Sequence, residues 1–194
     1  MRRVVIFNYN SRFSVDLMRM VGNYNLSFPG RHFDLGFYKY DSVVSESDAG
    51  KADVIIHSGG DGRPVKEDVT GIPKLYICYS HQWKAQAEGG RVARLSGCVS
   101  GVQEIDVIED DKVLGKKGKL PIMQFHEFAV VEPPSSAKVV ATSRGVDEAG
   151  KEVEIIEALR YDDDSISVQG HPEEGVGSMM LYNLFNTVAL ANVG

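Results

Sequence analysis

Residues 74–90 read KLYICYSHQWKAQAEGG, and this stretch decides the fold. The run from Lys74 to Cys78 follows Pro73 and has the length and apolar content of a short buried strand. The next residues, His81 to Glu88, have the composition of a helix, which Gly89-Gly90 would close. A strand that passes directly into a helix is the unit of parallel sheets covered by helices, and it places Cys78 at the turn.

The sequence before this stretch also predicts strands and a helix. A helix is predicted to begin at Ser14, to bury Val15, Met18 and Val21, and to end at Gly22. Short apolar runs predict three further strands, at Val4–Phe7, Phe33–Tyr40 and Lys51–Ile56.

The second half differs, because its apolar runs are short, alternate with polar residues and are separated by turns. The predicted strands there are Val99–Ile108, Pro121–Phe125, Lys138–Thr142, Val153–Leu159 and Ser165–Gln169. Val176 to Ala191 has apolar residues at helical spacing and predicts a packed terminal helix. We therefore expect one α/β domain over residues 1–194, with an open, mostly parallel central sheet, helices on both faces and a small antiparallel β portion.

Composition excludes several classes of protein. The 194 residues are 43% hydrophobic and 25% charged, which is typical of a globular chain. No apolar run approaches the roughly 20 residues of a membrane helix, and none behind Met1-Arg2-Arg3 is long enough for a signal peptide. The net charge of −6 argues against a nucleic-acid partner. The resulting expectation is a cytoplasmic protein without membrane or nucleic-acid binding.

Three separate places carry residues suited to catalysis. Cys78 lies at a strand-to-helix turn, where a thiol is exposed above the sheet and close to the positive end of the helix dipole. His171 and Glu173 flank Pro172 on an extended segment, so both side chains can face the same way. Ser58-Gly59-Gly60 follows a strand and offers unhindered backbone N–H groups. Taken singly, each has a simpler reading: a buried cysteine, a surface loop or a glycine-rich strand end.

Together these places resemble the class I (triad-type) glutamine amidotransferases. Ile77-Cys78-Tyr79-Ser80-His81-Gln82 with Gly89-Gly90 resembles the nucleophile motif G-[IV]-C-x-G-[HM]-Q followed by GG. Val168-Gln169-Gly170-His171-Pro172-Glu173 is similar to the Q-F-H-P-E motif, and Ser58-Gly59-Gly60 to the S-G-G-P loop. Phe125-His126-Glu127 with Val130 resembles the S-H-x-D-x-V segment. The resemblance spans essentially the whole chain and implies a flavodoxin-like sheet.

It also implies roles for individual residues. Cys78 would be the nucleophile, His171 the general base and acid, and Glu173 the carboxylate that orients it. The N–H groups of Gly60 and Tyr79 would form the oxyanion hole. The residues implied to bind substrate are Gly59, Gln82 and His126. The implied reaction releases ammonia from glutamine through a γ-glutamyl thioester, without metal or cofactor, for a separate synthetase.

Some positions depart from the family pattern. Tyr76 and Ser80 stand where the family has glycine on either side of the nucleophile, Asp61 where it often has proline, and Phe128 where it has aspartate. Two alternatives therefore stay open: a hydrolase of other γ-glutamyl amides or peptides with the same triad, and a noncatalytic regulatory or binding relative.

The remaining cysteine and histidines are interpreted as supporting residues. Cys98 is expected to be structural, His81 to support the turn at Cys78, and His32 and His57 to be noncatalytic. The Cys78-x-x-His81 spacing could form half of a metal site, but the sequence offers no second half, so no metal is expected.

Overall fold

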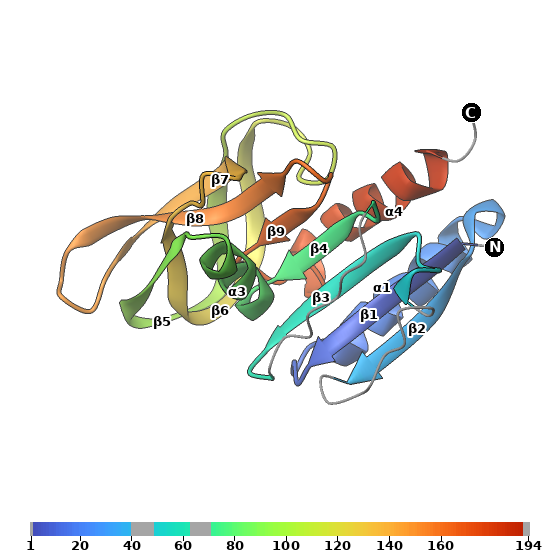
Figure 1. Cartoon of the computed structure of the whole chain (residues 1–194), viewed down its shortest axis with the longest axis horizontal. Coiled ribbons are helices and arrows are strands. Elements are labelled where there is room, and N and C mark those ends of the chain that lie inside the picture. The colour runs from blue at the N-terminus through green and yellow to red at the C-terminus, as the bar shows by residue number, and fades with distance from the viewer. Residues whose placement is uncertain (1, 40–48, 63–70, 192–194) are drawn as a thin grey trace.

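A mixed sheet carries the fold, in the strand order β2-β1-β3-β4-β9-β8-β7-β5-β6 (Figure 1). The structure is a computed structural model that describes residues 2–39, 49–62 and 71–191. The parallel strands are β2 (Phe33–Lys39), β1 (Arg2–Tyr9), β3 (Val54–Gly60), β4 (Lys74–Ile77) and β9 (Ile166–Val168). The antiparallel strands are β8 (Glu152–Tyr161), β7 (Ala137–Val146), β5 (Arg91–Val107) and β6 (Gly118–Glu132).

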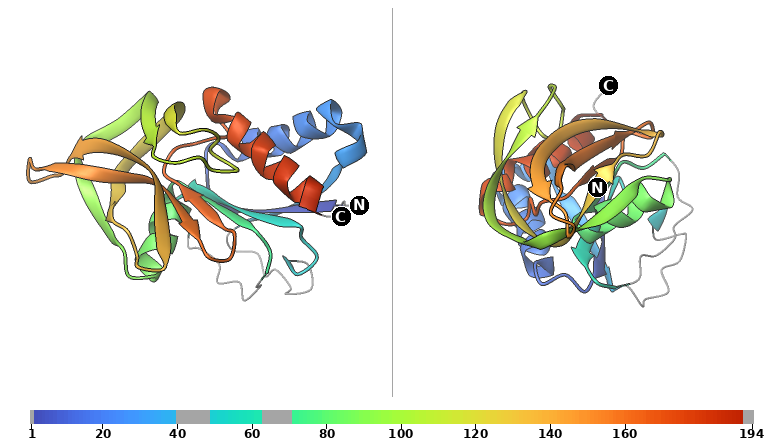
Figure 2. Two further views of the ribbon diagram at one scale, coloured as in Figure 1. Left: turned by 90° about the horizontal axis from the view of Figure 1, so that it is seen from above. Right: turned by 90° about the vertical axis from the view of Figure 1, so that its left-hand side faces the viewer.

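Helices cover both faces of the parallel strands. Helices α1 (Ser14–Ser27) and α4 (Met179–Ala191) lie side by side on one face, where Val4 and Ile6 of β1 point (Figures 1 and 2). Helix α3 (Tyr79–Ala87) lies on the other face and buries Ala85 against the antiparallel strands. The described residues also include two single turns of 3₁₀-helix, η1 (Pro29–Arg31) and η2 (Gly175–Gly177).

The expected α/β fold is confirmed, but the antiparallel portion is more extensive than the sequence indicated. Strands β5 and β6 contain 17 and 15 residues, whereas the parallel strands contain at most 8. These long strands bury few residues along their length, so their sequences resemble short strands separated by turns. They curl into a lobe beside α3, visible at the left of Figure 1.

Two helix predictions need correction. Helix α1 continues through Gly22 to Ser27. Of the three residues predicted to be buried, Val21 is buried, Met18 is half-buried and Val15 is 55% exposed, because the buried face of α1 is rotated from the predicted one. Its buried residues are Leu17, Met20, Val21 and Tyr24. Tyr24 packs edge-on against Phe185 of α4, and such burial outweighs the roughly 1 kcal/mol cost of glycine within a helix.

The terminal helix begins later than predicted, at Met179, and Val176 is exposed in η2. Met180, Leu184 and Val188 are buried, as their spacing indicated, although Met179 is exposed. Tyr40, the predicted end of β2, lies outside the described residues. Across the described ranges, none of the helices has the length and apolar content needed to cross a membrane.

Candidate active site

Cys78 forms the sharp turn between β4 and α3, as predicted. Its φ of 51° and ψ of −106° lie in a region that residues with a side chain rarely adopt. The turn is held on both sides, because the Cys78 N–H donates to Val168 of β9 at 2.8 Å and its carbonyl accepts from the Gln82 N–H at 3.1 Å. Strain maintained in this way is common at functional sites.

His171 and Glu173 lie just beyond β9 and contact each other. Nδ1 of His171 is 3.0 Å from Oε1 of Glu173, and both residues are buried. The backbone N–H of His171 donates to the Met123 carbonyl at 2.8 Å, which fixes the segment on β6. Burial by itself would lower the pKa of His171, but the neighbouring Cys78 and the hydrogen bond and charge of Glu173 raise it to about 10. The imidazole is thus favoured in its protonated form beside the sulfur.

Gly59 and Gly60 are the last two residues of β3, whereas the sequence had indicated that they follow the strand. They allow these groups to approach closely. A Cβ added at Gly59 would lie 3.1 Å from Cε1 of His171 and 3.2 Å from Cβ of Cys78. Gly60 has a φ of +120°, and a Cβ there would lie 2.0 Å from the Tyr9 carbonyl oxygen. Glycine is therefore required at position 60 by its backbone conformation and by β1, whereas at position 59 it allows the cysteine and the histidine to lie close by without displacement.

Ser80 and Tyr76, where the family pattern has glycine, are both accommodated. The Ser80 hydroxyl donates to the Ser58 carbonyl at 2.5 Å, which ties α3 to the end of β3. The Tyr76 ring stacks on His57 of the neighbouring strand, with ring centroids 4.5 Å apart and an interplanar angle of 8°. Because the two rings stack in parallel, the Tyr76 side chain packs against β3 at the end of the strand that leads to Cys78.

Gln169 is a site residue that the sequence analysis did not single out. Its Nε2 is 3.7 Å from Sγ of Cys78, and its Oε1 accepts from Nε2 of Gln82 at 3.1 Å. Gln82 also donates to the Phe128 carbonyl at 2.6 Å. The signal for Gln169 was its place at the start of the Gln169-Gly170-His171 motif, immediately before the histidine.

His126 lies in the wall opposite α3. Its Nδ1 is 2.9 Å from the Phe128 carbonyl, which can only accept, so Nδ1 carries the proton. Burial, with a smaller contribution from the charge of His171, lowers the pKa of His126 to about 4 despite that hydrogen bond. Its Nε2 is buried and has no hydrogen-bond partner among the described residues. A neutral imidazole thus offers an unused acceptor.

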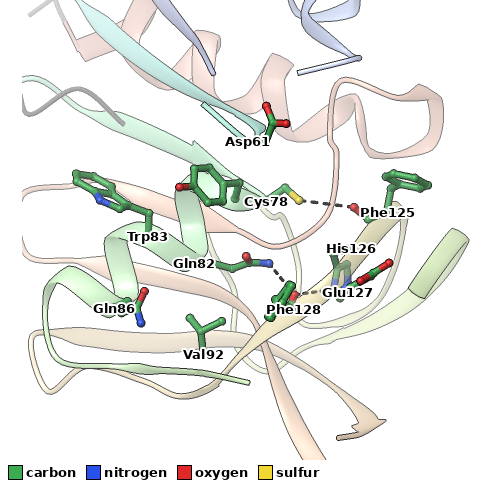
Figure 3. A pocket seen from close by; sticks show the side chains of 12 residues that line it. Asp61, Cys78, Gln82, Trp83, Gln86, Val92, Phe125, His126, Glu127 and Phe128 are labelled. Carbon is green, nitrogen blue, oxygen red and sulfur yellow. Dashed lines mark hydrogen bonds between the residues drawn. The ribbon is translucent and has the colours of Figure 1, made fainter. Parts of the chain in front are cut away.

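Two pockets meet at Cys78. The larger, about 580 Å³, lies between α3 and β6, and Figure 3 shows Gln82, His126 and Phe128 around it. Gly60 and Tyr79 also line it, and Trp83 and Val92 add apolar surface. The smaller, about 270 Å³, is lined by residues 10–13 and by His171.

The other cysteine and histidines lie away from this junction. His81 is buried with its ring nitrogens 2.7 Å from Oγ of Ser167 and 3.0 Å from the Ile156 carbonyl, and burial lowers its pKa to about 3. His81 therefore supports the turn, as expected. Cys98 is exposed on β5 rather than packed in the core, so its interpretation as a structural residue was wrong. No cluster of three potential metal ligands occurs in the described part of the chain.

Comparison with known proteins identifies the family of this chain. The family model for class I glutamine amidotransferases matches residues 27–190. The chain belongs to the class I glutamine amidotransferase family. A structure described as a putative GMP synthase subunit from Thermoplasma acidophilum superposes with a TM-score of 0.74 over 98% of this chain and 95% of its own, at 14% identity. At that identity the superposition shows the shared fold.

Sequence relatives in this family differ in activity. The glutamine-hydrolysing GMP synthase subunit of Saccharolobus solfataricus is 31% identical over 136 residues, 63% of this chain and 68% of the relative. Its counterpart in Sulfolobus acidocaldarius is 32% identical over 104 residues, 53% of this chain and 51% of the relative. Gamma-glutamyl peptidase 2 of Arabidopsis thaliana is 33% identical over 115 residues, 56% of this chain and 42% of the relative. The matches therefore span between two fifths and about two thirds of these relatives.

Proposed function

We propose that this chain is a cysteine hydrolase that releases ammonia from the side-chain amide of glutamine. The observation that carries the proposal is that Cys78 and His171 both lie close to Gly59, with Glu173 3.0 Å from the imidazole, where two pockets meet. A nucleophile, a base and a group that orients the base are the parts that covalent hydrolysis needs.

The reaction runs in two halves. His171 holds the thiol proton while Sγ of Cys78 attacks the amide carbon and forms a tetrahedral intermediate. The N–H groups of Gly60 and Tyr79 stabilise the oxyanion; Tyr79 is the first residue of α3, so its N–H has no acceptor within the helix. The amide nitrogen takes the proton from His171 and leaves as ammonia. Water then attacks the carbonyl carbon of the γ-glutamyl thioester while His171 takes a proton from it, and His171 passes that proton to the sulfur as glutamate departs.

The larger pocket suits the glutamyl group. Gln82 and His126 line it from opposite walls. Asp61 and Glu127 also line the pocket, and their negative charge favours the α-ammonium group of an amino acid. Gly59 lies close to both Cys78 and His171. We assign Gly59, Gln82 and His126 to substrate binding, together with the two acidic residues.

A separate synthetase is the proposed partner. Two of the relatives above are named as subunits of a glutamine-hydrolysing GMP synthase, which supports a glutaminase that supplies ammonia to another chain. We expect low glutaminase activity from the isolated chain and stimulation by its synthetase. If binding of the partner aligns an oxyanion donor at Gly59-Gly60, the end of β3, the stimulation should be roughly 10²- to 10³-fold.

Hydrolysis of γ-glutamyl peptides is the second candidate. The relative named gamma-glutamyl peptidase 2 favours it. Full activity of the isolated chain, unchanged by any synthetase, would favour this candidate over the role of ammonia supplier.

The decisive experiment measures glutamate release from glutamine, with and without candidate synthetases. Cys78→Ala should abolish release without unfolding the chain, because no other group can carry the acyl intermediate. Glu173→Ala should cost less, since His171 can still act as a base. Cys98→Ala is the matched control, because that cysteine is exposed and lines neither pocket. Equal release by Cys78→Ala and the native chain would refute the proposal.

A further inference from the structure

The two pockets at Cys78 differ in the chemical groups that line them. Gln82 and His126 line the larger pocket and not the smaller, whereas His171 lines the smaller and not the larger. Cys78 lines both, together with Gly60 and Phe125. Cys78 therefore lies between the larger pocket, which contains the proposed contacts to the glutamyl group, and the smaller pocket, which contains the proposed proton donor.

This division fixes the direction in which the substrate lies. In the tetrahedral intermediate the carbon bears the glutamyl chain, the oxyanion, the sulfur and the nitrogen of the leaving group. The nitrogen must face His171, because a general acid has to come within hydrogen-bond reach of the atom that it protonates. Any substituent on that nitrogen then extends into the smaller pocket.

The smaller pocket is much larger than ammonia requires. Its volume is about 270 Å³, whereas a molecule the size of water takes up ~30 Å³ in the liquid. Phe13 packs against the imidazole of His171, with ring centroids 4.5 Å apart, and Phe125 also lines the pocket. The pocket thus has room and apolar surface for the side chain of an amino acid.

Arg12 gives this pocket its positive charge. Its guanidinium carbon lies 5.3 Å from the centroid of the Phe13 ring and 4.9 Å from that of Phe125, so two aromatic faces hold it in place. Arg12 is the only lysine or arginine among the described residues that line the two pockets, and no acidic side chain of the described ranges pairs with it. Asp61, which borders both pockets, accepts a hydrogen bond from Asn10 at 3.0 Å instead.

We propose that the smaller pocket binds the leaving group of γ-glutamyl amino acids, with Arg12 paired to the carboxylate of the released amino acid. Phe13 and Phe125 pack against its side chain, so aromatic and large apolar amino acids fit best. This inference rests on the proposed thioester chemistry at Cys78 and names a class of amide donor for it.

The covalent step balances without a further reactant. The bond from Sγ of Cys78 to the γ-carbon forms, and the bond from that carbon to the amide nitrogen breaks. The nitrogen takes the proton that His171 received from the thiol, and a free amino acid leaves. Water then hydrolyses the thioester to glutamate and restores the thiol, as it does with glutamine.

A binding experiment tests the subsite without requiring turnover. In the Cys78→Ala background, calorimetry would compare γ-glutamyl-phenylalanine with γ-glutamyl-phenylalanine amide, which lacks the terminal carboxylate. We expect the acid to bind about three- to tenfold more tightly, the range of a partly exposed charged pair. Arg12→Met should bring that ratio close to one. Arg19→Met is the matched control and should keep the ratio, because Arg19 lies on the exposed face of α1 and pairs with Asp16.

Three outcomes would overturn the inference. One is equal affinity for the acid and the amide in the Cys78→Ala chain, and another is an unchanged ratio in Arg12→Met. The third is an equal loss of affinity for both compounds and for glutamine, which would place Arg12 on the α-carboxylate that all three share.

Turnover separates this inference from the proposed function. Glutamate release from glutamine that depends on Cys78, together with any of these three outcomes, would reject the leaving-group subsite alone. If neither glutamine nor γ-glutamyl-phenylalanine is hydrolysed, with or without a synthetase, both proposals fail.

Discussion

The substitution Gly59→Ala tests whether the close approach of Cys78 and His171 sets the rate of the reaction. Ordinary contacts between carbon atoms are about 3.5–4.0 Å. The new Cβ would lie 3.1 Å from Cε1 of His171 and 3.2 Å from Cβ of Cys78, so at least one group must move by roughly 0.5 Å. Glu173 holds His171 in place, and the backbone hydrogen bonds of the turn hold Cys78. Any displacement therefore changes how the thiol and the imidazole are aligned with each other.

The expected loss of activity is large and the expected loss of stability small. A misplacement of reacting groups by about 1 Å can lower the rate 10²-fold, so a displacement of roughly 0.5 Å predicts a loss of roughly 10-fold or more. Gly59 does not have a positive φ, so alanine adds no backbone strain. Overpacking should then lower the free energy of unfolding by only about 1–2 kcal/mol.

Two measurements on one preparation provide the test: the rate at which a glutamine-like electrophile labels Cys78, and the free energy of unfolding in urea. Gly97→Ala is the control, because no atom lies within 4 Å of a Cβ there. Gly60→Ala should instead unfold the chain readily, since its Cβ would meet the Tyr9 carbonyl at 2.0 Å. A Gly59→Ala chain that is labelled as fast as the native chain would refute the reasoning.

Three further predictions concern charge and stability. Glu173→Gln should lower the pKa of His171, which NMR titration would measure. A raised histidine pKa stabilises the fold fully below pH about 6.5, and this stabilisation disappears as the pH rises through about 10. The substitution should therefore lower the free energy of unfolding more at pH 6 than at pH 10. An unchanged histidine titration would contradict it. Asp111→Ala should lower the free energy of unfolding by roughly 3 kcal/mol. It removes the bidentate partner of the mostly buried Arg160 and the acceptor of the N–H groups of Val113 and Leu114. A loss no greater than that caused by Asp110→Ala, at an exposed position, would argue against it. Gly22→Ala should raise the free energy of unfolding by about 0.5–1 kcal/mol, since α1 runs through this position with open space around it, and a decrease in the urea midpoint would count against that account.

The sequence predicted the parallel half of the sheet better than the antiparallel half. Strands β1, β3 and β4 are buried on both faces, so each is a nearly continuous apolar run that local composition reveals. Strand β5 is exposed along most of its 17 residues, and its alternation resembles that of a shorter strand with turns. Gly22 was taken for a helix end because local propensity contains no information about the contact of Tyr24 with α4.

The candidate site divides in the same way. The turn at Cys78 and the pairing of His171 with Glu173 depend on neighbours in sequence, so the sequence alone determined them: a strand ends at a helix start, and Pro172 separates two side chains on one extended segment. The contact of Gln169 with Cys78 and the position of Arg12 in the pocket beside His171 join segments that lie far apart in the chain. Only the tertiary structure decided these, because the order of strands in a sheet sets which distant residues meet, and that order depends on how the whole core packs rather than on any local pattern.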